Sequence, residues 1–316
     1  MSPNYSQTDT SVGFTPRRVL IVGYSYDAPQ VSQQVADYLA AKGIKSDKIT
    51  CDPWGNCGND ECNLENAREK ASRCDLAVVL GGDGSFLRAV DLAHGADIPL
   101  IGINMGHVGF LAEREIDGIW DALDRLAAGQ FTIKNRLTID VSIVNNDVVR
   151  AGSWAFNELS IAKSSHRGVL EATLAVDNHP VSEYACDGIL VATPTGSTAY
   201  AFSAGGPVLW PETAAMLVVP NNAHGLFTRP LVLSPESIVA VDVNSTKGGI
   251  VAHLDGYREI EVRSGERVVA RAGHRPVRVI RLDARPFADK LVRKFRLPVK
   301  GWRSGNRHSL PKNDEE

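Results

Sequence analysis

The chain has 316 residues, of which 43% are hydrophobic and 22% are charged, and its net charge is −3. This length allows one large domain or two ordinary ones, and we expect two. The balanced charge gives no electrostatic case for nucleic acid or an acidic membrane as a partner. No run approaches the ~18 apolar residues that cross a bilayer, and the polar N-terminus lacks the order of a signal peptide, so a cytoplasmic protein is expected.

The N-terminal part of the chain alternates short apolar runs with helical patterns. We predict strands at 17–25, 75–80 and 98–103, and helices at 31–42, 64–72, 86–94 and 116–127. The runs at 75–80 and 98–103 have no polar face, as is typical of buried parallel strands, and both lead into glycine-rich turns. This pattern predicts an α/β domain with an open, mostly parallel sheet, in which ligands bind beyond the carboxyl ends of the strands.

From about Phe131 the pattern changes to short alternating strands, which predicts an antiparallel all-β domain ending with a strand at 277–282. The junctions 145–147 and 177–179 indicate hairpin turns, because Asn and Asp tolerate left-handed backbone angles. An amphipathic segment, Phe287–Phe295, is predicted to form a C-terminal helix that packs back on the first domain. We therefore divide the chain into a disordered N-terminus, an α/β domain, a β-rich domain, and a return helix with a disordered tail, over residues 1–16, 17–134, 135–285 and 286–316.

Cysteines cluster at one place, where Cys51, Cys57 and Cys62 lie in the segment CDPWGNCGNDEC. Their spacing matches no common zinc pattern, and no nearby His completes a tetrahedral set. The odd total of five cysteines, in a chain without an export signal, indicates reduced thiols. A loop with incidental thiols is therefore favoured, with a metal or redox site as the alternative.

The first glycine-rich turn, Gly81-Gly82-Asp83-Gly84-Ser85, follows the apolar run at 75–80. Glycines permit the positive backbone angles that aim successive amide N–H groups at one point, and the following helix adds the positive end of its dipole. The turn can therefore bind an anion. A carboxylate at Asp83 would repel a phosphate unless it accepts a proton from an attacking hydroxyl or acts through Mg²⁺. The alternative is a tight turn whose Asp caps the helix.

Two further polar motifs follow in the β-rich part. The segment TPTGSTAY, Thr193 to Tyr200, offers hydroxyls and amides that suit ribose, phosphate oxygens and base edges. Its alternative is a turn in which Ser197 or Thr198 caps a helix. Asn157-Glu158 interrupts a strand pattern, and an Asn side chain can both donate to and accept from an adenine edge. Because adjacent strand residues point to opposite faces, an exposed strand end is the alternative for this pair.

Four motifs in this order resemble those of the ATP-dependent NAD kinase family, and the chain is similar to its bacterial members over roughly Val19 to Phe295. They are GGDGSFLRA, NMGHVGFLAE, WAFNELSI and DGILVATPTGSTAYAFSAGGP. The resemblance implies transfer of the γ-phosphate of ATP, or of a phosphate of polyphosphate, to the 2′-hydroxyl of the adenosine ribose of NAD. It also implies Mg²⁺ or another divalent cation carried mainly by ATP, no metal-binding side chain of the chain's own, and self-association as a homotetramer or dimer.

The same resemblance implies a catalytic role for Asp83, as a general base or positioning group for the 2′-hydroxyl. It implies phosphate-binding roles for Gly82, Gly84, Ser85 and Arg88, and NAD-binding roles for Asp83, Gly84, Phe110, Asn157, Glu158, Asp187, Thr198, Ala199, Tyr200 and Ser203. Some of the NAD-binding positions reach across a subunit interface in the family. The stretch His253 to Gly256 resembles a late Asp-Gly segment of the family, which implies a segment that closes over the site.

The sequence also departs from the family pattern. Ser85 replaces a residue that is often Thr and keeps its hydroxyl, whereas the stretch 218–230 is looser than usual, so His224 and Arg229 are as well explained as a loop His and a surface Arg. Two other functions stay open. A lipid kinase could share the glycine turn, and a non-catalytic sensor could bind NADP(H). ATP or polyphosphate as the donor, NAD or NADH as the acceptor, and regulation by NADP(H) are left undecided.

Overall fold

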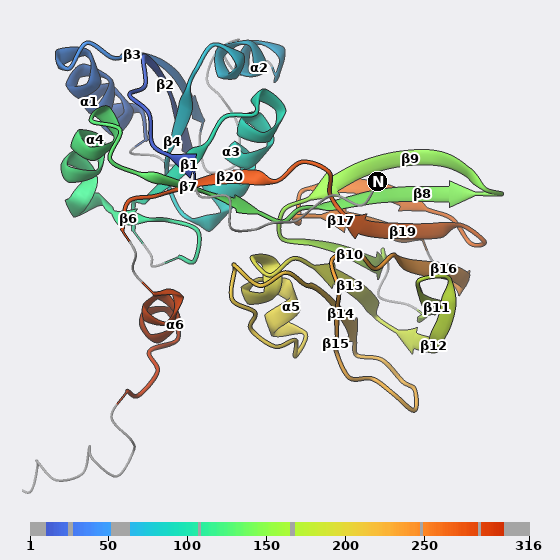
Figure 1. Ribbon diagram of the computed structural model, residues 1–316. Coiled ribbons are helices and arrows are strands. Elements are labelled where there is room, and N and C mark those ends of the chain that lie inside the picture. Colours follow the sequence, from blue (N-terminus) through green and yellow to red (C-terminus); the bar gives the residue numbers. More distant parts are fainter. Residues whose placement is uncertain are drawn as a thin grey trace, which may run out of the picture.

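The computed structural model describes residues 11–24, 28–51, 64–106, 109–164, 168–246, 249–283 and 286–299. Figure 1 shows an α/β domain beside a β-rich domain, with a C-terminal helix below the first of them. The predicted fold class is therefore confirmed. Among the residues that the structure describes, none of the helices is both long and apolar enough to cross a membrane.

The first domain is built on one twisted sheet, which within the described ranges has eight strands in the order β1-β7-β20-β5-β4-β2-β3, with β6 beside β5. Its strands are β1 (Ser11–Val12), β2 (Arg18–Tyr24), β3 (Lys45–Cys51), β4 (Leu76–Leu80), β5 (Leu100–Asn104), β6 (Arg114–Glu115), β7 (Thr132–Arg136) and β20 (Val277–Arg281). β2, β3, β4 and β5 pair in parallel, and every side chain of β4 and β5 is buried. Full burial explains why these strands are continuous apolar runs.

Helices cover both faces of this sheet. They are α1 (Ala28–Ala41), α2 (Leu64–Ser72), α3 (Asp83–Ala96) and α4 (Ile119–Ala127). The core on one face joins α1 and α4 to the sheet, and the core on the other face joins α2 and α3 to it. The helix α3 that follows the glycine turn is thereby fixed on the face that also contacts Phe156 of the β-rich domain.

Three features of the first domain differ from the sequence predictions. Residues 11–16 are described, and Ser11–Val12 pairs with β7, so the prediction of disorder over 1–16 is wrong for that part. β3 was missed, because its residues KSDKITC are largely polar at the edge of the sheet. β20 was predicted to belong to the β-rich domain, but it lies inside the first sheet, between β7 and β5 (Figure 1). The first domain is therefore discontinuous in sequence.

The β-rich domain consists of two antiparallel sheets, each with six strands in the described part of the chain, in the orders β15-β14-β13-β10-β17-β18 and β12-β11-β16-β19-β8-β9. One sheet contains β10 (Glu158–Lys163), β13 (Gly188–Ala192), β14 (Met216–Asn221), β15 (Leu231–Leu233), β17 (Ile250–Leu254) and β18 (Arg258–Val262). The other contains β8 (Ile139–Asn145), β9 (Val148–Ala155), β11 (Leu170–Val176), β12 (His179–Cys186), β16 (Val239–Thr246) and β19 (Arg267–Ala272). Alternate side chains from both sheets form one shared core, as in a β-sandwich.

The two predicted hairpin turns are confirmed by their backbone angles. Asn146 and Asp147 have φ values of 47° and 62°, and Asp177 and Asn178 have φ values of 51° and 65°. Asn and Asp adopt this left-handed region more readily than other residues with a side chain, because their short polar groups bond locally. These turns set the registers of the β8–β9 and β11–β12 pairs.

The remaining helical elements lie around the junction of the two domains. They are the 3₁₀ turns η2 (Ile116–Gly118) and η3 (Gly196–Thr198), the short helix α5 (Tyr200–Ser203) and the C-terminal helix α6 (Phe287–Phe295). Helix α6 contacts the first domain, as predicted, through Lys290, which donates to the Phe110 carbonyl at 3.1 Å. It also contacts the β-rich domain through Phe295, whose ring lies 4.8 Å from that of Phe202.

Candidate functional site

The glycine turn begins at a backbone position that only glycine can occupy. Gly81 is buried with a φ of 151°, and a Cβ there would lie 2.3 Å from the Ser85 hydroxyl oxygen. The Ser85 hydroxyl donates to the Tyr24 carbonyl at 3.3 Å, which ties the turn to the end of β2. Gly82 and Gly84 are exposed, with open space where a Cβ would be. A ligand can therefore approach the backbone of the turn closely at the positive end of α3.

Asp83 is the first helical residue of α3, and its carboxylate faces the second glycine-rich segment. It accepts hydrogen bonds from the backbone N–H groups of Phe110, at 2.9 Å, and Leu111, at 3.0 Å. A Cβ at Gly109 would lie 2.2 Å from an Asp83 oxygen, so this close approach requires glycine. The position that caps α3 is Gly82, so the interpretation of Asp83 as a helix cap is wrong. The two glycine-rich turns instead form one unit around this carboxylate.

Strand register in the β-rich domain brings three distant segments to one edge. Glu158, at the start of β10, pairs with Ala192 at the end of β13, so Asn157-Glu158 lies beside Thr193. Leu159 pairs with Leu254 at the end of β17, so Asp255 follows at the same edge. The side of α3 then meets this edge, since the Phe86 and Phe156 ring centroids are 6.3 Å apart. The glycine turn and the Asn–Glu pair are thereby joined through neighbouring residues.

Both members of the Asn–Glu pair are buried, so the interpretation as an exposed strand end is wrong. Asn157 is 6% exposed and Glu158 is 7% exposed. Within the part of the chain that the structure describes, Asn157 Oδ1 and Glu158 Oε2 are buried without a hydrogen-bond partner. Buried polar atoms are normally paired, because an unpaired one costs about 1–3 kcal/mol. These two oxygens are therefore candidate hydrogen-bonding atoms for a ligand.

The threonine-rich turn packs directly on this pair. The Thr193 hydroxyl donates to the Phe156 carbonyl at 2.7 Å and accepts from the Gly196 N–H at 3.0 Å. A Cβ at Gly196 would lie 2.0 Å from the Asn157 carbonyl oxygen, so glycine permits the contact. The predicted cap is wrong, because Ser197 bonds the Pro194 carbonyl and the Leu209 N–H, while Ala199 precedes α5. The hydroxyls of this turn therefore fix the turn itself in this structure.

Asp255 anchors the backbone of the Asn–Glu pair. Its backbone has a φ of 53°. Its carboxylate accepts hydrogen bonds from the N–H groups of Phe156, Asn157 and Glu158 at 2.9, 2.6 and 3.3 Å. Burial raises the pKa of Asp255, and these N–H groups and the Arg258 guanidinium oppose that rise. The prediction that this segment closes over the site is wrong for Asp255, which is 7% exposed and lies beneath the pair.

An ion pair and a phenol connect Asp255 to the helix of the glycine turn. Arg258 contacts Asp255 at 2.7 Å and Asp91 of α3 at 3.1 Å, and its guanidinium lies over the Trp154 ring. The Tyr257 hydroxyl donates to Asp91 at 2.7 Å. No sequence pattern predicted this network, since its only local signal was the Asp-Gly turn after β17. The network holds the two halves of the candidate site against each other.

Asp187 lies away from these residues within one chain. It precedes β13, whereas Thr193 follows it, so the two are separated by roughly 20 Å at about 3.3 Å per residue. Its carboxylate contacts Lys163 at 2.6 Å and accepts from the Asn222 amide at 3.0 Å, and these partners lower its pKa. The Tyr200 hydroxyl extends toward the same end and accepts from the Asn221 amide at 3.1 Å.

Comparisons with known proteins agree with this geometry. Residues 26–131 match the family model described as the ATP-NAD kinase N-terminal domain, and residues 156–282 match that of the C-terminal domain. The chain belongs to the NAD kinase family. Similar relatives are the NAD kinase of Corynebacterium diphtheriae, 57% identical over 78% of each chain, and that of Corynebacterium jeikeium, 53% identical over 93% of this chain and 92% of that protein.

Two solved structures share the fold. The crystal structure of yeast NADH kinase complexed with NADH has a TM-score of 0.76 at 18% identity, covering 98% of this chain and 94% of that one. An NAD kinase from Archaeoglobus fulgidus in complex with ATP has a TM-score of 0.67 at 23% identity, covering 88% of this chain and 98% of that one. At these identities the likeness shows the fold alone.

The side chains of the other residues predicted from the family resemblance contact aromatic rings or belong to the threonine-rich turn and the helix after it. The Arg88 guanidinium lies over the Tyr24 ring, 5.5 Å from its centroid. Phe110 packs against Phe287 and Phe295 of α6. Thr198, Ala199 and Ser203 belong to the turn and helix η3–α5. His224 and Arg229 are exposed, and their roles stay undecided.

The structure describes only some of the residues that the cysteine and metal predictions concern. Cys57, Cys62 and the side chain of Cys51 lie outside the described residues, so the role of this cluster stays a prediction. Among the described residues, no three His, Cys, Asp or Glu side chains gather closely enough to hold a metal ion. A divalent cation at this site would therefore need phosphate oxygens among its ligands, with Asp83 as the nearest carboxylate of the glycine turn.

Glu158 gives a prediction for the pH dependence of stability. Burial, and then the charge of Asp255, raise the pKa of Glu158 from 4.5 to about 8, against the backbone of Tyr200. Between these values Glu158 binds more protons in the folded chain than in the unfolded chain, so its contribution to stability is full below pH 4.5 and is lost as the pH rises through 8. We expect Glu158→Gln to abolish this decrease in the free energy of unfolding, which amounts to at most about 1.4 kcal/mol per pH unit.

Urea unfolding of both proteins between pH 5 and 9 measures this difference. The stability of Glu158→Gln minus that of the unaltered chain is expected to grow with pH. Glu183→Gln is a matched control, because that side chain is exposed on the edge strand β12 and accepts a hydrogen bond from the Asn244 amide. Parallel curves for the unaltered chain and Glu158→Gln would show that Glu158 is ionised throughout.

Proposed function

We propose that this chain is an NAD kinase, which transfers the γ-phosphate of ATP to the 2′-hydroxyl of the adenosine ribose of NAD. The observation that carries the proposal is Asp83, a carboxylate at the head of α3 between exposed glycines, in a chain of the NAD kinase family. Relatives that cover most of this chain are named NAD kinase. A structural neighbour bound to NADH and another bound to ATP support both substrates.

The chain's own groups divide the work of phosphoryl transfer. The Gly81–Ser85 turn and the positive end of α3 bind phosphate oxygens, with Arg88 adding positive charge beside them. Asp83 orients the 2′-hydroxyl and accepts its proton, since the Phe110 and Leu111 N–H groups hold the carboxylate in place. Phosphoryl transfer depends mainly on positioning and charge neutralisation, so one carboxylate is chemically sufficient.

The adenosine half of NAD is assigned to the edge of the β-rich domain. The unpaired oxygens of Asn157 and Glu158 are the buried polar atoms available to it. Thr198, Ala199 and Tyr200 line its path along the threonine-rich turn. Mg²⁺, or another divalent cation carried mainly by ATP, neutralises the phosphate charge when it is bound. Asp83 is the side chain that fits a contact with that cation.

A coupled assay tests the proposal. Purified protein is supplied with Mg²⁺, with ATP or polyphosphate, and with NAD or NADH, and NADP is detected with a dehydrogenase that accepts only NADP. NADP formation from ATP and NAD is the expected result. Activity with polyphosphate or with NADH would assign those substrates as well, while binding of NADP without turnover would support a sensor.

Two rival functions fit the site less well. A lipid kinase could share the glycine turn, but the segment that packs on Asn157 is polar in its TPTGST sequence, which favours a hydrophilic acceptor. A non-catalytic sensor of NADP(H) would place the 2′-phosphate near Asp83, where like charges repel. Location in the cytoplasm stays a prediction, which cell fractionation tests. Regulation by NADP(H) stays undecided, and inhibition kinetics would decide it.

Self-association is proposed because Asp187 and the glycine turn lie apart within one chain. An Asp187 contributed by a second subunit would complete the site as the family resemblance implies, in a dimer or a homotetramer built from dimers. We expect Asp187→Ala to raise the KM for NAD about tenfold, which corresponds to the loss of one hydrogen bond to a charged group. The oligomer itself is expected to be measurable by light scattering after gel filtration.

Co-expression of two defective chains tests the shared site. Asp83→Asn and Asp187→Ala each damage one contribution, so a mixed dimer contains one site with both contributions intact. At low NAD the co-expressed pair is expected to exceed the mean activity of the two variants alone. An activity equal to that mean, in a protein shown to be a mixed oligomer, would place each site within one subunit.

A further inference from the structure

Helix α6 is fixed over the second glycine-rich segment by aromatic contacts. The Phe287 and Phe295 rings lie 6.0 and 5.6 Å from that of Phe110. The same two rings contact the β-rich domain, where Phe287 lies 5.4 Å from Trp210 and Phe295 lies 4.8 Å from Phe202. Offset and edge-to-face aromatic pairs each add stability beyond their burial. The helix therefore has a defined position between the two domains.

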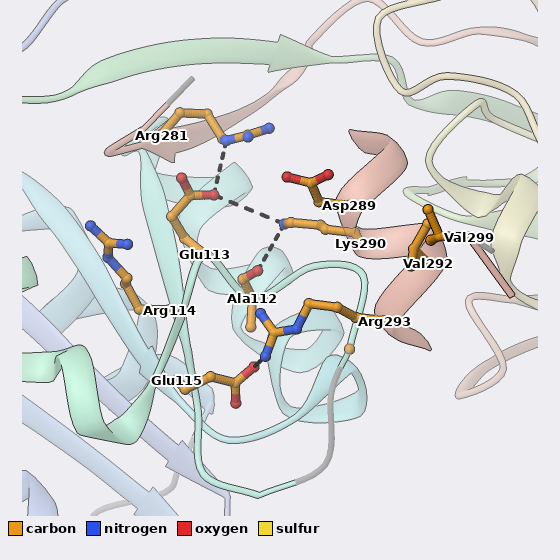
Figure 2. A pocket seen from close by; sticks show the side chains of 11 residues that line it. Ala112, Glu113, Arg114, Glu115, Arg281, Asp289, Lys290, Val292, Arg293 and Val299 are labelled. Carbon is orange, nitrogen blue, oxygen red and sulfur yellow. Dashed lines mark hydrogen bonds and ion pairs between the residues drawn. The ribbon is translucent and has the colours of Figure 1, made fainter. Parts of the chain in front are cut away.

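Lys290 projects from this helix toward the backbone that holds Asp83. Its ammonium donates to the Phe110 carbonyl at 3.1 Å and to the Ala112 carbonyl at 2.8 Å. It also lies 3.9 Å from a Glu113 oxygen, and Glu113 contacts Arg281 at 2.8 Å. Figure 2 shows the Lys290 ammonium joined to Glu113 and to the Ala112 carbonyl, and Arg281 joined to the same oxygen of Glu113.

One peptide group connects Lys290 to Asp83. The carbonyl of Phe110 and the N–H of Leu111 belong to the same planar peptide unit. Its oxygen accepts from Lys290, and its N–H donates to the Asp83 carboxylate at 3.0 Å. A cation at the oxygen polarises the peptide and strengthens the hydrogen bond that its N–H donates. The side chain on α6 thus acts on the catalytic carboxylate without touching it.

We propose that Lys290 is a positioning residue for phosphoryl transfer, because it fixes and polarises the Phe110–Leu111 peptide that orients the Asp83 carboxylate. The kinetic part of this proposal rests on the proposed NAD kinase activity. The structural part does not, since the peptide contacts exist whatever reaction the site performs.

Solvent can exchange protons with Lys290. Its side chain is 21% exposed and lines a cavity of about 500 Å³ (Figure 2). Burial lowers the pKa of Lys290 to about 8. The neighbouring carboxylates of Glu113 and Asp83 oppose this shift, the guanidinium groups of Arg281 and Arg136 add to it, and Asp289 and Arg293 of the same helix line the cavity. Above this pH the ammonium loses its charge and its hold on the peptide weakens.

Three variants test the role by kinetics. We expect Lys290→Met to lower kcat about 10- to 100-fold, with the KM values for NAD and ATP changed less than about threefold, because misplacement of a reacting group by about 1 Å costs up to this factor. Arg293→Met is the matched control, because it removes a cation from the same helix and cavity whose partner is Glu115. It is expected to stay within about twofold of the unaltered chain.

Lys290→Arg separates positioning from folding. Arginine keeps its charge at all accessible pH values, so we expect partial recovery of kcat and a plateau that extends to higher pH than in the unaltered chain. If the role of Lys290 were purely structural, Lys290→Arg would not shift the pH at which kcat falls on the alkaline side of its pH profile. Values of kcat for Lys290→Met within twofold of the unaltered chain would overturn the proposal, as would an alkaline limb that Lys290→Arg does not move.

Hydrogen exchange gives a readout that needs no turnover. In Lys290→Met the Phe110 and Leu111 amides are expected to exchange at least about tenfold faster, while the amides of β4 stay protected. Unchanged exchange at Phe110 and Leu111 overturns the proposal even if the chain has no NAD kinase activity. If the unaltered chain forms no NADP, but the Phe110 and Leu111 amides still exchange faster in Lys290→Met, the proposed function is refuted and the Lys290 contact is established.

Discussion

Replacing Asp83 by Asn is expected to lower kcat for NADP formation about 10²-fold or more, with small changes in the KM values for ATP and NAD. A group that accepts a proton from the attacking hydroxyl contributes a factor of about 10² to 10⁴. The amide keeps the size of the side chain and one acceptor oxygen, but its NH₂ group cannot accept the second backbone hydrogen bond. Steady-state kinetics of the purified variant measure the effect.

The stability of the same variant separates chemistry from structure. Loss of one of the two hydrogen bonds from Phe110 and Leu111 is expected to cost about 1–3 kcal/mol in urea unfolding, which leaves the fold intact. Asp97→Asn is a matched control at the other end of α3, because Asn tolerates the φ of 55° found there. A loss of only a fewfold in kcat for a folded Asp83→Asn protein would reduce Asp83 to a structural residue.

Replacing Asp255 by Ala is expected to lower the free energy of unfolding by about 3–5 kcal/mol. The substitution leaves the buried N–H groups of Phe156, Asn157 and Glu158 without their acceptor. It also removes one of the two carboxylates that contact Arg258, the other being that of Asp91. Loss of the acceptor of three buried N–H groups, together with one partner of a buried ion pair, costs about this much. Urea or thermal unfolding measures the change, and the KM for NAD is expected to rise as the Asn–Glu backbone loosens.

An exposed Asp–Arg pair in the same domain provides the control. Asp242 and Arg267 contact each other at 2.6 Å, with side chains 32% and 45% exposed. Asp242→Ala is expected to cost about 1 kcal/mol or less, because surface ion pairs are screened by water and salt. Similar losses for Asp242→Ala and Asp255→Ala would contradict the anchoring role of Asp255.

The local patterns of the chain predicted most of the elements. The apolar runs at 75–80 and 98–103 became β4 and β5, and helix α2 has the predicted bounds of 64–72. Residues that favour one backbone conformation, such as Asn146 and Asp177, placed the hairpins. β20 was assigned to the wrong domain because a short alternating run fits a strand of the antiparallel domain and a strand inside the other sheet equally well.

By itself the sequence determined the motifs, the order of the elements and the family to which they belong. Tertiary structure alone decided which polar groups meet. The bonds from Phe156 to Asp255 and from Lys290 to the Phe110 carbonyl join residues 99 and 180 positions apart. Such contacts depend on strand register and on where a distant helix docks, and neither is encoded in the spacing of nearby residues. For this physical reason Asp83 could be named from its motif, while its support by Lys290 could not.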